Sequence, residues 1–429
     1  MNRVLGQRGI ALIVISWLVI LLSLWGVLFL REAAVQGAAS GHAASRYRAL
    51  LACESAVDRV AAYLQQEDNQ SGPGQLQPWA DNPDDLTQIE VDEKHFAAVL
   101  SYDVEKKELR YGLSDEASRL NLMVATKEQL IQIPGMTEEA AEAIIDWRDE
   151  DGETSGEGGA ENEFYALLKR AYEPKNQEFE TLGELLYVKG VDPLLLYGED
   201  WNLNGRLDKN EDDGGQTRPD DDGNGELAPG IWRFLTLYSY EKDLDPDGEA
   251  RVNINSAEAE ELAPLLGKLT QEQLQRIPNS RPYSSIADLT KVNNISTDDL
   301  LKVIDYITVN KGEYQTGRVN VVTAPREVLL ALDLDEEETE KLIAFRSDKT
   351  EGLDTLAWLI TELGYDTFKK IANLVTVRSF QYRFQVQGWV EGGTAFARRW
   401  YVVDRSEDTF RILHQRDLHR YGPLRLPEK

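Results

Sequence analysis

One stretch of the chain, DWNLNGRLDKNE at residues 200–211, has oxygen-bearing side chains at the spacing of a calcium-binding loop. It fits the pattern D-x-[DN]-x-[DN]-G-x5-E at every defined position. A hard cation takes about six to eight oxygen ligands, and the glycine at the sixth position permits the sharp turn that gathers them. The predicted calcium ligands are Asp200, Asn202, Asn204, the carbonyl of Arg206, Asp208 and Glu211. No clear amphipathic helix flanks the loop, so we expect one EF-like loop, with a solvated acidic turn as the alternative.

Two further acidic runs share this alternation but lack the final glutamate. In DDDGNGE, the residues at loop positions one, three and five are Asp220, Asp222 and Asn224, and Ile231 stands where the bidentate glutamate belongs. A carboxylate such as Glu226, Asp212 or Asp213 would have to complete a second calcium site there, and a flexible acidic loop is the alternative. The run DLDPDGE at residues 243–249 also lacks the final glutamate. It is a third candidate calcium loop, with a simple turn before the second repeat as the alternative.

Composition and motifs argue against an enzyme or a nucleic-acid-binding protein. The chain has 75 acidic and 46 basic residues and a formal charge of -29, which repels phosphates. Its four histidines are scattered, and it has neither an HExxH pair, a phosphate-binding glycine-rich loop nor a GxSxG elbow. The single cysteine, Cys53, excludes an intramolecular disulfide and lies on an apolar stripe of helical spacing, where we expect it to be buried.

The N-terminal segment predicts a membrane helix. Residues 10–30 carry no charge, and at about 1.5 Å per residue they span about 31 Å, the thickness of the hydrocarbon core. Arg3 and Arg8 precede the span, so the positive-inside rule places the N-terminus in the cytoplasm and the bulk of the chain outside. The span is too long for an ordinary signal peptide, although the alanine-rich stretch after it keeps that alternative open.

The short basic leader ending in Gly9, followed by an apolar run that becomes an amphipathic helix, resembles the signal of type IV pilins and type II secretion pseudopilins. The resemblance implies that a prepilin peptidase cuts between Gly9 and Ile10 and that Ile10 is N-methylated. Most members of that family carry glutamate as the fifth mature residue, where this chain has Val14. A carboxylate inside a bilayer is kept only where it has a partner. Its absence is typical of the minor pseudopilin K, a tip subunit.

Three segments share one phrase: SRLNLMVA from residue 118, ARVNINSA from residue 250 and GRVNVVTA from residue 317. The first and third continue as helix, turn and helix, which resembles a helix-hairpin-helix module, whereas the second degenerates and is only a partial match. Such modules usually bind DNA through a glycine-rich hairpin and nearby basic residues. Here carboxylates occupy the hairpins at residues 134–139 and 333–338, so we expect them to serve packing or protein contacts.

The stretch GAENEFYALLKRAYEPKNQEFETLGELLYVKG, together with WRDED at residues 147–151, closely resembles the type II secretion protein K family. Strand patterns at residues 95–113 and in three runs near the C-terminus enclose this helical region. The expected fold class is α+β: a pilin-like long N-terminal helix on an antiparallel sheet, with a large inserted α-helical domain that contains helix-hairpin-helix-like units.

The predicted divisions are a prepilin leader (1–9), a transmembrane helix (10–30), an amphipathic helix with first strands (31–114), an inserted helical domain with calcium loops (115–310), a second helix-hairpin-helix-like segment (311–375) and C-terminal strands (376–429).

The expected function is that of a minor pseudopilin, a tip subunit of the type II secretion pseudopilus that acts in filament assembly and export of folded proteins. The resemblance implies a single-pass inner-membrane protein with a periplasmic head that binds calcium. Implied partners are other minor pseudopilins, the prepilin peptidase, and the secretin or secreted proteins, without nucleic acid. Two alternatives remain: a membrane-anchored extracytoplasmic helix-hairpin-helix DNA receptor, which predicts basic hairpins, and an exported calcium-binding surface protein, which predicts a different mature N-terminus.

Overall fold

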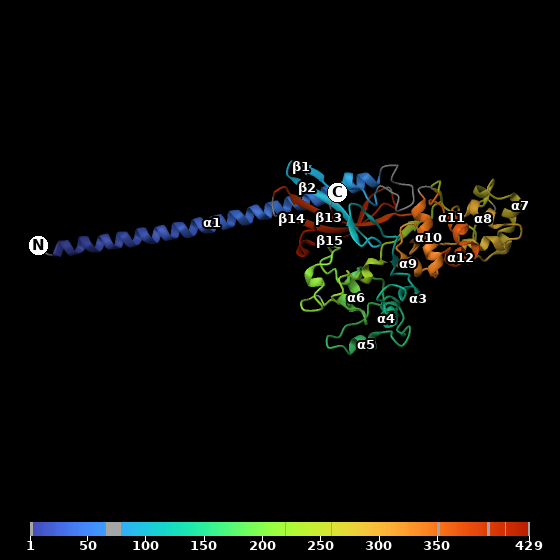
Figure 1. Ribbon diagram of the computed structural model, residues 1–429, viewed down its shortest axis with the longest axis horizontal. Coiled ribbons are helices and arrows are strands. Elements are labelled where there is room, and N and C mark those ends of the chain that lie inside the picture. Colours follow the sequence, from blue (N-terminus) through green and yellow to red (C-terminus); the bar gives the residue numbers. More distant parts are fainter. Residues whose placement is uncertain are drawn as a thin grey trace.

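A single long helix dominates the N-terminal part of the chain. The computed structural model describes residues 3–65, 79–218, 220–258, 260–349, 352–392, 395–407 and 409–427. Helix α1 (Arg3–Leu64) runs 62 residues without a break and extends far beyond the rest of the molecule (Figure 1). Every large apolar side chain from Leu12 to Leu30 is more than half exposed. With a mean hydropathy of 2.7 and no burial in its most apolar window, the helix is long and apolar enough to cross a membrane.

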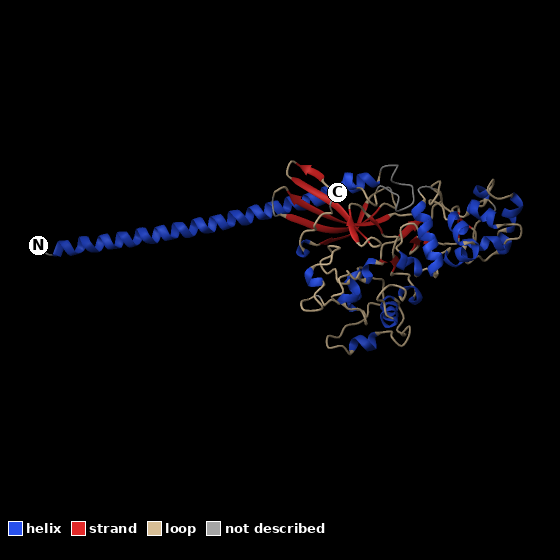
Figure 2. Ribbon diagram, viewed as in Figure 1, coloured by secondary structure: helices blue, strands red, loops and turns tan. Residues whose placement is uncertain are grey.

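The C-terminal end of α1 packs on an antiparallel sheet built from both ends of the remaining chain. Strands β1 (Ile89–Asp92), β2 (His95–Asp103), β13 (Gln381–Val390), β14 (Phe396–Asp404) and β15 (Arg411–Asp417) lie side by side in that order. Two short strands extend the sheet, since β3 (Glu108–Arg110) pairs with β2 and β4 (Ser114–Asp115) pairs with β13. The sheet is therefore completed only by strands that follow everything between β4 and β13. Figure 2 shows the sheet in red beside the end of α1, with most of the shorter helices to its right and below it.

Small residues let α1 approach the sheet closely. Ala49, Ala52 and Ala56 are fully buried on the sheet side of α1. A Cβ atom added at Gly388 of β13 would lie 2.2 Å from the carbonyl oxygen of Ala49, so only glycine fits there. Cys53 is buried in the same contact, as its place on the apolar stripe predicts, and burial raises the pKa of its thiol to about 12.

The chain between β4 and β13 has a separate hydrophobic core, formed by buried residues from Leu120 to Val377. This one cluster crosses the boundary predicted at residues 310/311. Three pairs of two-residue parallel strands organise it, and each pair joins the start of a repeat to its end. The pairs are β5 (Leu120–Asn121) with β6 (Leu235–Thr236), β8 (Val252–Asn253) with β9 (Ile307–Thr308), and β11 (Val319–Asn320) with β12 (Val375–Thr376).

Each repeat opens with an asparagine and closes with a threonine, and the side chains of both accept hydrogen bonds from nearby backbone amides. The side-chain oxygens of Asn121, Asn253 and Asn320 accept hydrogen bonds from the amide two residues ahead, at 2.9, 2.9 and 3.0 Å. The hydroxyls of Thr236, Thr308 and Thr376 do the same at 3.0, 3.0 and 3.2 Å. The expectation that the second repeat is only partial is therefore wrong: its weak helical pattern hides a unit with the same opening and closing strands.

Helical turns fill the space between the opening and closing strands. The remaining elements are α2 (Pro83–Leu86), α3 (Lys127–Leu130), α4 (Glu138–Arg148), α5 (Asn162–Ala166), η3 (Leu182–Tyr187), α6 (Pro193–Tyr197), η4 (Lys209–Glu211), η5 (Ile231–Arg233), β7 (Tyr240–Lys242), η6 (Ala263–Leu265), α7 (Gln271–Arg276), η7 (Pro278–Ser280), η8 (Ile286–Lys291), α8 (Thr297–Val303), β10 (Tyr314–Thr316), α9 (Arg326–Leu330), α10 (Glu336–Asp348), α11 (Ala357–Leu363), α12 (Tyr365–Ile371) and η9 (His419–Tyr421). The predicted α+β class, with a long helix, an antiparallel sheet and an inserted helical region, is confirmed.

Four of the turns between these helices share one geometry, with a single left-handed residue two positions before the N-cap of the next helix. These residues are Gly135, Gly190, Asn294 and Asp333, with φ of 83°, 80°, 72° and 64°. In each case the next helix begins with a side-chain cap, from Thr137, Asp192, Ser296 and Asp335. The two hairpins expected from the sequence are thus joined by two more of similar geometry.

Candidate calcium-binding loop and its attachment to the sheet

The loop that follows α6 folds around its first carboxylate. Asp200 is fully buried, and its Oδ1 and Oδ2 accept hydrogen bonds from the amides of Asn204 and Gly205 at 2.8 and 3.0 Å. Gly205 has a φ of +69°, which an L side chain rarely adopts, and it makes the sharp turn expected at the sixth loop position. The amide of Arg206 then donates to Asn204 Oδ1 at 2.8 Å, which keeps the Arg206 backbone within the turn.

The remaining predicted ligands point toward one another. Asp208 Oδ2 accepts hydrogen bonds from the side-chain amides of Asn202 and Asn204 at 2.7 and 2.8 Å. Glu211 closes the loop, because its two oxygens accept from the amides of Trp201 and Asp208 at 3.2 and 3.1 Å. The structure thus brings together the loop residues that the spacing singled out.

The electrostatics of the loop suit a cation. Glu211 is 1% exposed, and its pKa is raised to about 7, first by burial and then by the charges of Asp200 and Asp208, against the hydrogen bonds that it accepts. Asp200 is paired on its outer side with the guanidinium of Arg233, and Asp208 and Glu211 have no basic partner among the ion pairs of the described residues. An all-oxygen donor set with uncompensated buried charge fits a calcium ion, which Asp200, Asn202, Asn204, Asp208 and Glu211 would hold.

The same loop is fastened to the sheet by residues from three strands. The guanidinium of Arg398 in β14 donates to the carbonyls of Asn202, at 2.9 Å, and Leu203. Gln385 in β13 donates to the Leu203 carbonyl at 3.1 Å. On β2, the ring of Tyr102 lies so close to Gly205 that a Cβ atom there would be 2.8 Å from it. The contacts that attach the loop to the sheet therefore also hold the loop backbone in its folded conformation.

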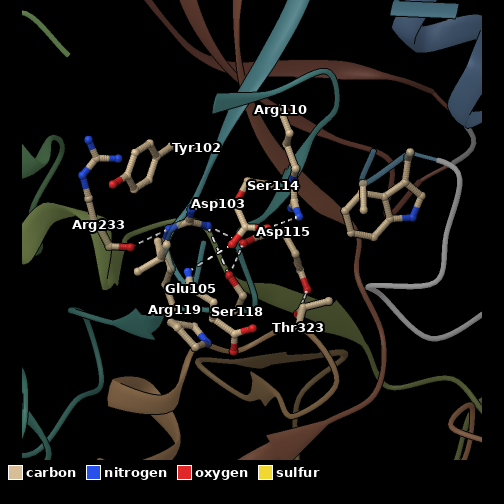
Figure 3. A pocket seen from close by; sticks show the side chains of 14 residues that line it. Tyr102, Asp103, Glu105, Arg110, Ser114, Asp115, Ser118, Arg119, Arg233 and Thr323 are labelled. Carbon is tan, nitrogen blue, oxygen red and sulfur yellow. Dashed lines mark hydrogen bonds and ion pairs between the residues drawn. The ribbon is translucent and has the colours of Figure 1, made fainter. Parts of the chain in front are cut away.

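A buried polar network continues this attachment where the inserted region joins β4 (Figure 3). Asp115 accepts hydrogen bonds from Thr323 and Ser379 at 2.6 Å each and from Asn320 at 3.0 Å, so it links the third repeat to the start of β13. Arg119, in the first repeat, donates to Ser114 at 2.8 Å and to the carbonyl of Arg233 at 3.0 Å. Arg233 in turn stacks its guanidinium 3.5 Å over the ring of Tyr102.

The second acidic run lies in an exposed turn, where side-chain oxygens accept hydrogen bonds from backbone amides of the same turn. Asp222 accepts hydrogen bonds from the side chain and backbone amide of Asn224 at 2.7 and 3.0 Å. Glu226 forms an ion pair with Lys107 at 3.6 Å, and Asp220 is exposed. Asp212 does reach this turn, where it accepts from the amide of Gly225 at 2.9 Å. The structure therefore gathers part of the predicted second set, and the site stays a prediction.

The third acidic run forms a turn. Asp245 accepts from the amides of Asp247 and Glu249 at 2.9 and 3.0 Å, and Asp243 is engaged by Arg251 at 3.4 Å. Gly9 and Ile10, the predicted processing site, lie within α1, and their cleavage stays a prediction.

The geometry also reveals a carboxylate group that the motif patterns missed. Asp149, Asp151 and Glu161 each place one oxygen within 4.8 Å of the others. All three lie in the stretches that resemble the protein K family, but their spacing matches no calcium-loop pattern. The Asp-x-Asp alternation directly after α4 was the signal that could have found them.

The exposed apolar helix packs at its far end on an antiparallel sheet, which is the pilin-like arrangement expected from the sequence. Residues 112–197 match the family of type II secretion system protein K, over its first domain. The expected resemblance to type II secretion system protein K is confirmed on this segment, which includes helices α3 to α6 of the first repeat.

Two further proteins are similar to the chain. The endonuclease/exonuclease/phosphatase family domain-containing protein 1 of Xenopus laevis is 26% identical over 206 residues, which are 47% of this chain and 29% of that protein. Since the chain spans less than a third of that relative, the activity in its name stays with that protein. The crystal structure of the GspK-GspI-GspJ complex from the type 2 secretion system of enterotoxigenic Escherichia coli is 14% identical, covers 90% of this chain and 99% of that chain, and has a TM-score of 0.39.

Proposed function

We propose that this chain is a minor pseudopilin of the type II secretion system that occupies the tip of the periplasmic pseudopilus and acts in filament assembly and protein export. The carrying observation is the protein K segment, residues 112–197, which includes strand β4 of the pilin-like sheet and continues into the region inserted between β4 and β13. This arrangement gives a large head, made of the sheet and the inserted region, on a stem formed by helix α1. The function is assembly, and the chain needs no catalytic site for it.

The stem joins the head to the inner membrane. The exposed apolar part of α1 spans the bilayer as a single pass, with Arg3 and Arg8 on the cytoplasmic side and the head in the periplasm. A prepilin peptidase cuts between Gly9 and Ile10 and methylates Ile10. The exposed helix then packs among the similar helices of other minor pseudopilins, which are its partners in a tip complex.

The size of the head supports the tip position. More than 350 residues follow α1, and such a head would crowd the regular stack of a thin filament. Val14 stands where pilins carry the carboxylate that bonds the neighbouring subunit's amine, so the helix lacks the group for a further subunit in that direction. The secretin or an exported protein would meet the face of the head that points away from the membrane.

Calcium in the loop at residues 200–211 fastens the inserted region to the sheet. The loop contacts Tyr102, Gln385 and Arg398 on three strands, so an ion that orders the loop also stabilises the attachment of the inserted region to the sheet. Binding to the folded state alone stabilises it by mass action.

Acidic hairpins favour this function over DNA uptake. Glu138 and Glu139 lie at the start of α4, and three glutamates from Glu336 to Glu338 lie at the start of α10. Carboxylates at a helix N-terminus occupy the place where a phosphate would bind.

The test is mass spectrometry of the mature N-terminus from native membranes, with the prepilin peptidase present and then deleted. We expect a chain that starts at methylated Ile10 only when the peptidase is present. An intact Met1 in both strains, or a start beyond Ala33, would contradict the pseudopilin route and favour an anchored or exported calcium-binding protein.

A further inference from the structure

A group of carboxylates lies between the end of α4 and the start of α5. Asp149 follows the last residue of α4, Asp151 is two residues further on, and Glu161 is the N-cap residue of α5. One oxygen of each lies within 4.8 Å of the other two. Oxygens that bind one calcium ion at about 2.4 Å are separated by no more than about 4.8 Å, so the three can share an ion.

Buried oxygens at this place lack the hydrogen bonds that buried acceptors normally make. Glu161 is 6% exposed, yet its Oε1 is buried without a hydrogen-bond partner among the described residues, and its side chain does not cap α5. Asp149 Oδ1 and Asn176 Oδ1 are buried and unpartnered as well. Asn176 belongs to the same group, because its side-chain amide donates to the Asp151 carbonyl at 3.0 Å. Such atoms are costly to bury and call for a ligand.

The basic side chain next to Asp149 in sequence is directed elsewhere. Arg148, adjacent to Asp149 in sequence, donates both guanidinium arms to the carbonyls of Leu122 and Ala125. Burial raises the pKa of Asp149 to about 6, assisted by the charges of Asp151 and Asp146. The pKa of Glu161 is raised by burial and by the charges of Asp146 and Asp149. Negative charge is therefore concentrated here with little compensation.

We propose that Asp149, Asp151 and Glu161 hold a calcium ion, with the side-chain oxygen of Asn176 as a neutral ligand. The ligands are all hard oxygens, and the exposed side of Asp151 admits water to complete the coordination. The ion joins the end of α4 to the start of α5 and so closes the loop at residues 150–160.

This site is separate from the loop at residues 200–211 and shares no ligand with it. The inner face of the loop at residues 150–160 is already held by α4, since Asp146 accepts from the amides of Ser155 and Ala160 at 2.8 and 2.6 Å. The ion adds the outer connection. The proposal does not depend on secretion or on a place in a filament.

The test compares thermal unfolding of the detergent-solubilised full chain in calcium and in chelator. Glu161→Gln keeps the side-chain shape and removes one charge from the group. We expect it to need at least tenfold more calcium for the same rise in unfolding midpoint, while in chelator it unfolds at the same or a higher temperature, because charge repulsion is relieved. Asp208→Asn is introduced into every variant so that the other loop does not contribute.

The matched control is Glu157→Gln in the same loop, at an exposed position, which should keep the calcium response of its parent. Asp149→Asn should repeat the result of Glu161→Gln. Equal destabilisation by Glu161→Gln in calcium and in chelator would show a structural role only and overturn the proposal. An unchanged calcium response would also overturn it. A rise of the same size with magnesium at equal concentration would contradict the choice of calcium.

Discussion

Arg398, on strand β14, donates a hydrogen bond of 2.9 Å to the backbone carbonyl of Asn202, the third residue of the candidate calcium loop. The same guanidinium reaches the Leu203 carbonyl and the side-chain oxygen of Gln385, and the residue is fully buried. Although burial lowers its pKa to about 10, the group stays charged at neutral pH. A cation from the sheet thus satisfies the outer carbonyls of a loop whose inner side is lined with carboxylates.

Replacing this arginine should detach the loop from the sheet. Arg398→Met leaves the Asn202 carbonyl without its donor and the Leu203 carbonyl with Gln385 alone, at a cost of about 3 kcal/mol in the free energy of unfolding. Chemical unfolding of the full chain in detergent measures it. Arg399→Gln, on the next residue, removes a pairing with the half-exposed Glu54 and should cost less than about 1 kcal/mol. Equal losses for the two variants would contradict a specific clamp.

Removing a carboxylate from the loop should weaken its calcium response. Asp208→Asn deletes one charge among the proposed ligands and should raise the calcium concentration needed for half of the stabilisation by at least about tenfold, or 1.4 kcal/mol. Calcium titrations of the unfolding midpoint, in the Glu161→Gln background, isolate this loop. Asn210→Ala, at an exposed position of the same loop that supplies no ligand, is the control. A wild-type response in Asp208→Asn would remove the loop as a calcium site.

Two glycines with the same backbone angle separate strain from crowding. Gly205 and Gly214 both have a φ of +69°, but an added Cβ meets the Tyr102 ring at 2.8 Å in the first and nothing within 4 Å in the second. Gly214→Ala should therefore cost about 1 kcal/mol for the left-handed conformation alone. Gly205→Ala should cost about 3 kcal/mol, since the loop must also move from the sheet. Similar unfolding free energies for the two variants would show that the loop is not pressed against Tyr102.

Local patterns in the sequence predicted the parts of the fold that local forces determine. The apolar stripe around Cys53, the C-terminal strands and the loop from Asp200 to Glu211 each need only spacing within a short window. The sequence pattern of the second repeat degenerates after its opening phrase, and its closing strand at Ile307–Thr308 pairs with residues more than fifty positions earlier. Two-residue parallel strands leave no periodicity to read.

Long-range contacts also explain what was missed at the sites. Nothing near Asp200 in the sequence indicates that Arg398 and Gln385 would bond to the loop, because those residues lie in the last strands. Glu161 is ten residues from Asp151 and joins it only because the intervening loop folds back on α4 through Asp146. Spacing in the sequence cannot identify the ligands of such a site, because they come together only when the chain has folded.

Acid should weaken the second repeat through Asp288. Burial alone would raise the pKa of this carboxyl, but hydrogen bonds from Lys291, at 2.8 Å, and from the hydroxyl and amide of Ser284, at 2.6 and 3.1 Å, outweigh it and hold the pKa at about 2. A carboxylate with a lowered folded-state pKa stabilises the fold above its unfolded pKa of about 4, and this contribution is lost as pH falls toward about 2. Asp288→Asn should therefore unfold with about 1 to 2 kcal/mol less free energy at pH 7.

The difference in unfolding free energy between the wild-type and Asp288→Asn chains should shrink as the pH is lowered. Denaturant unfolding of wild-type and Asp288→Asn chains at a series of pH values from about 7 to about 2 measures it, and the comparison cancels the acid response of all other groups when they are independent of Asp288. A gap that stays constant down to about pH 2 would mean that the variant acts through lost packing. A difference in unfolding free energy that grows in acid would mean that the pKa of Asp288 is raised rather than lowered. Burial, rather than Lys291 and Ser284, would then set that pKa.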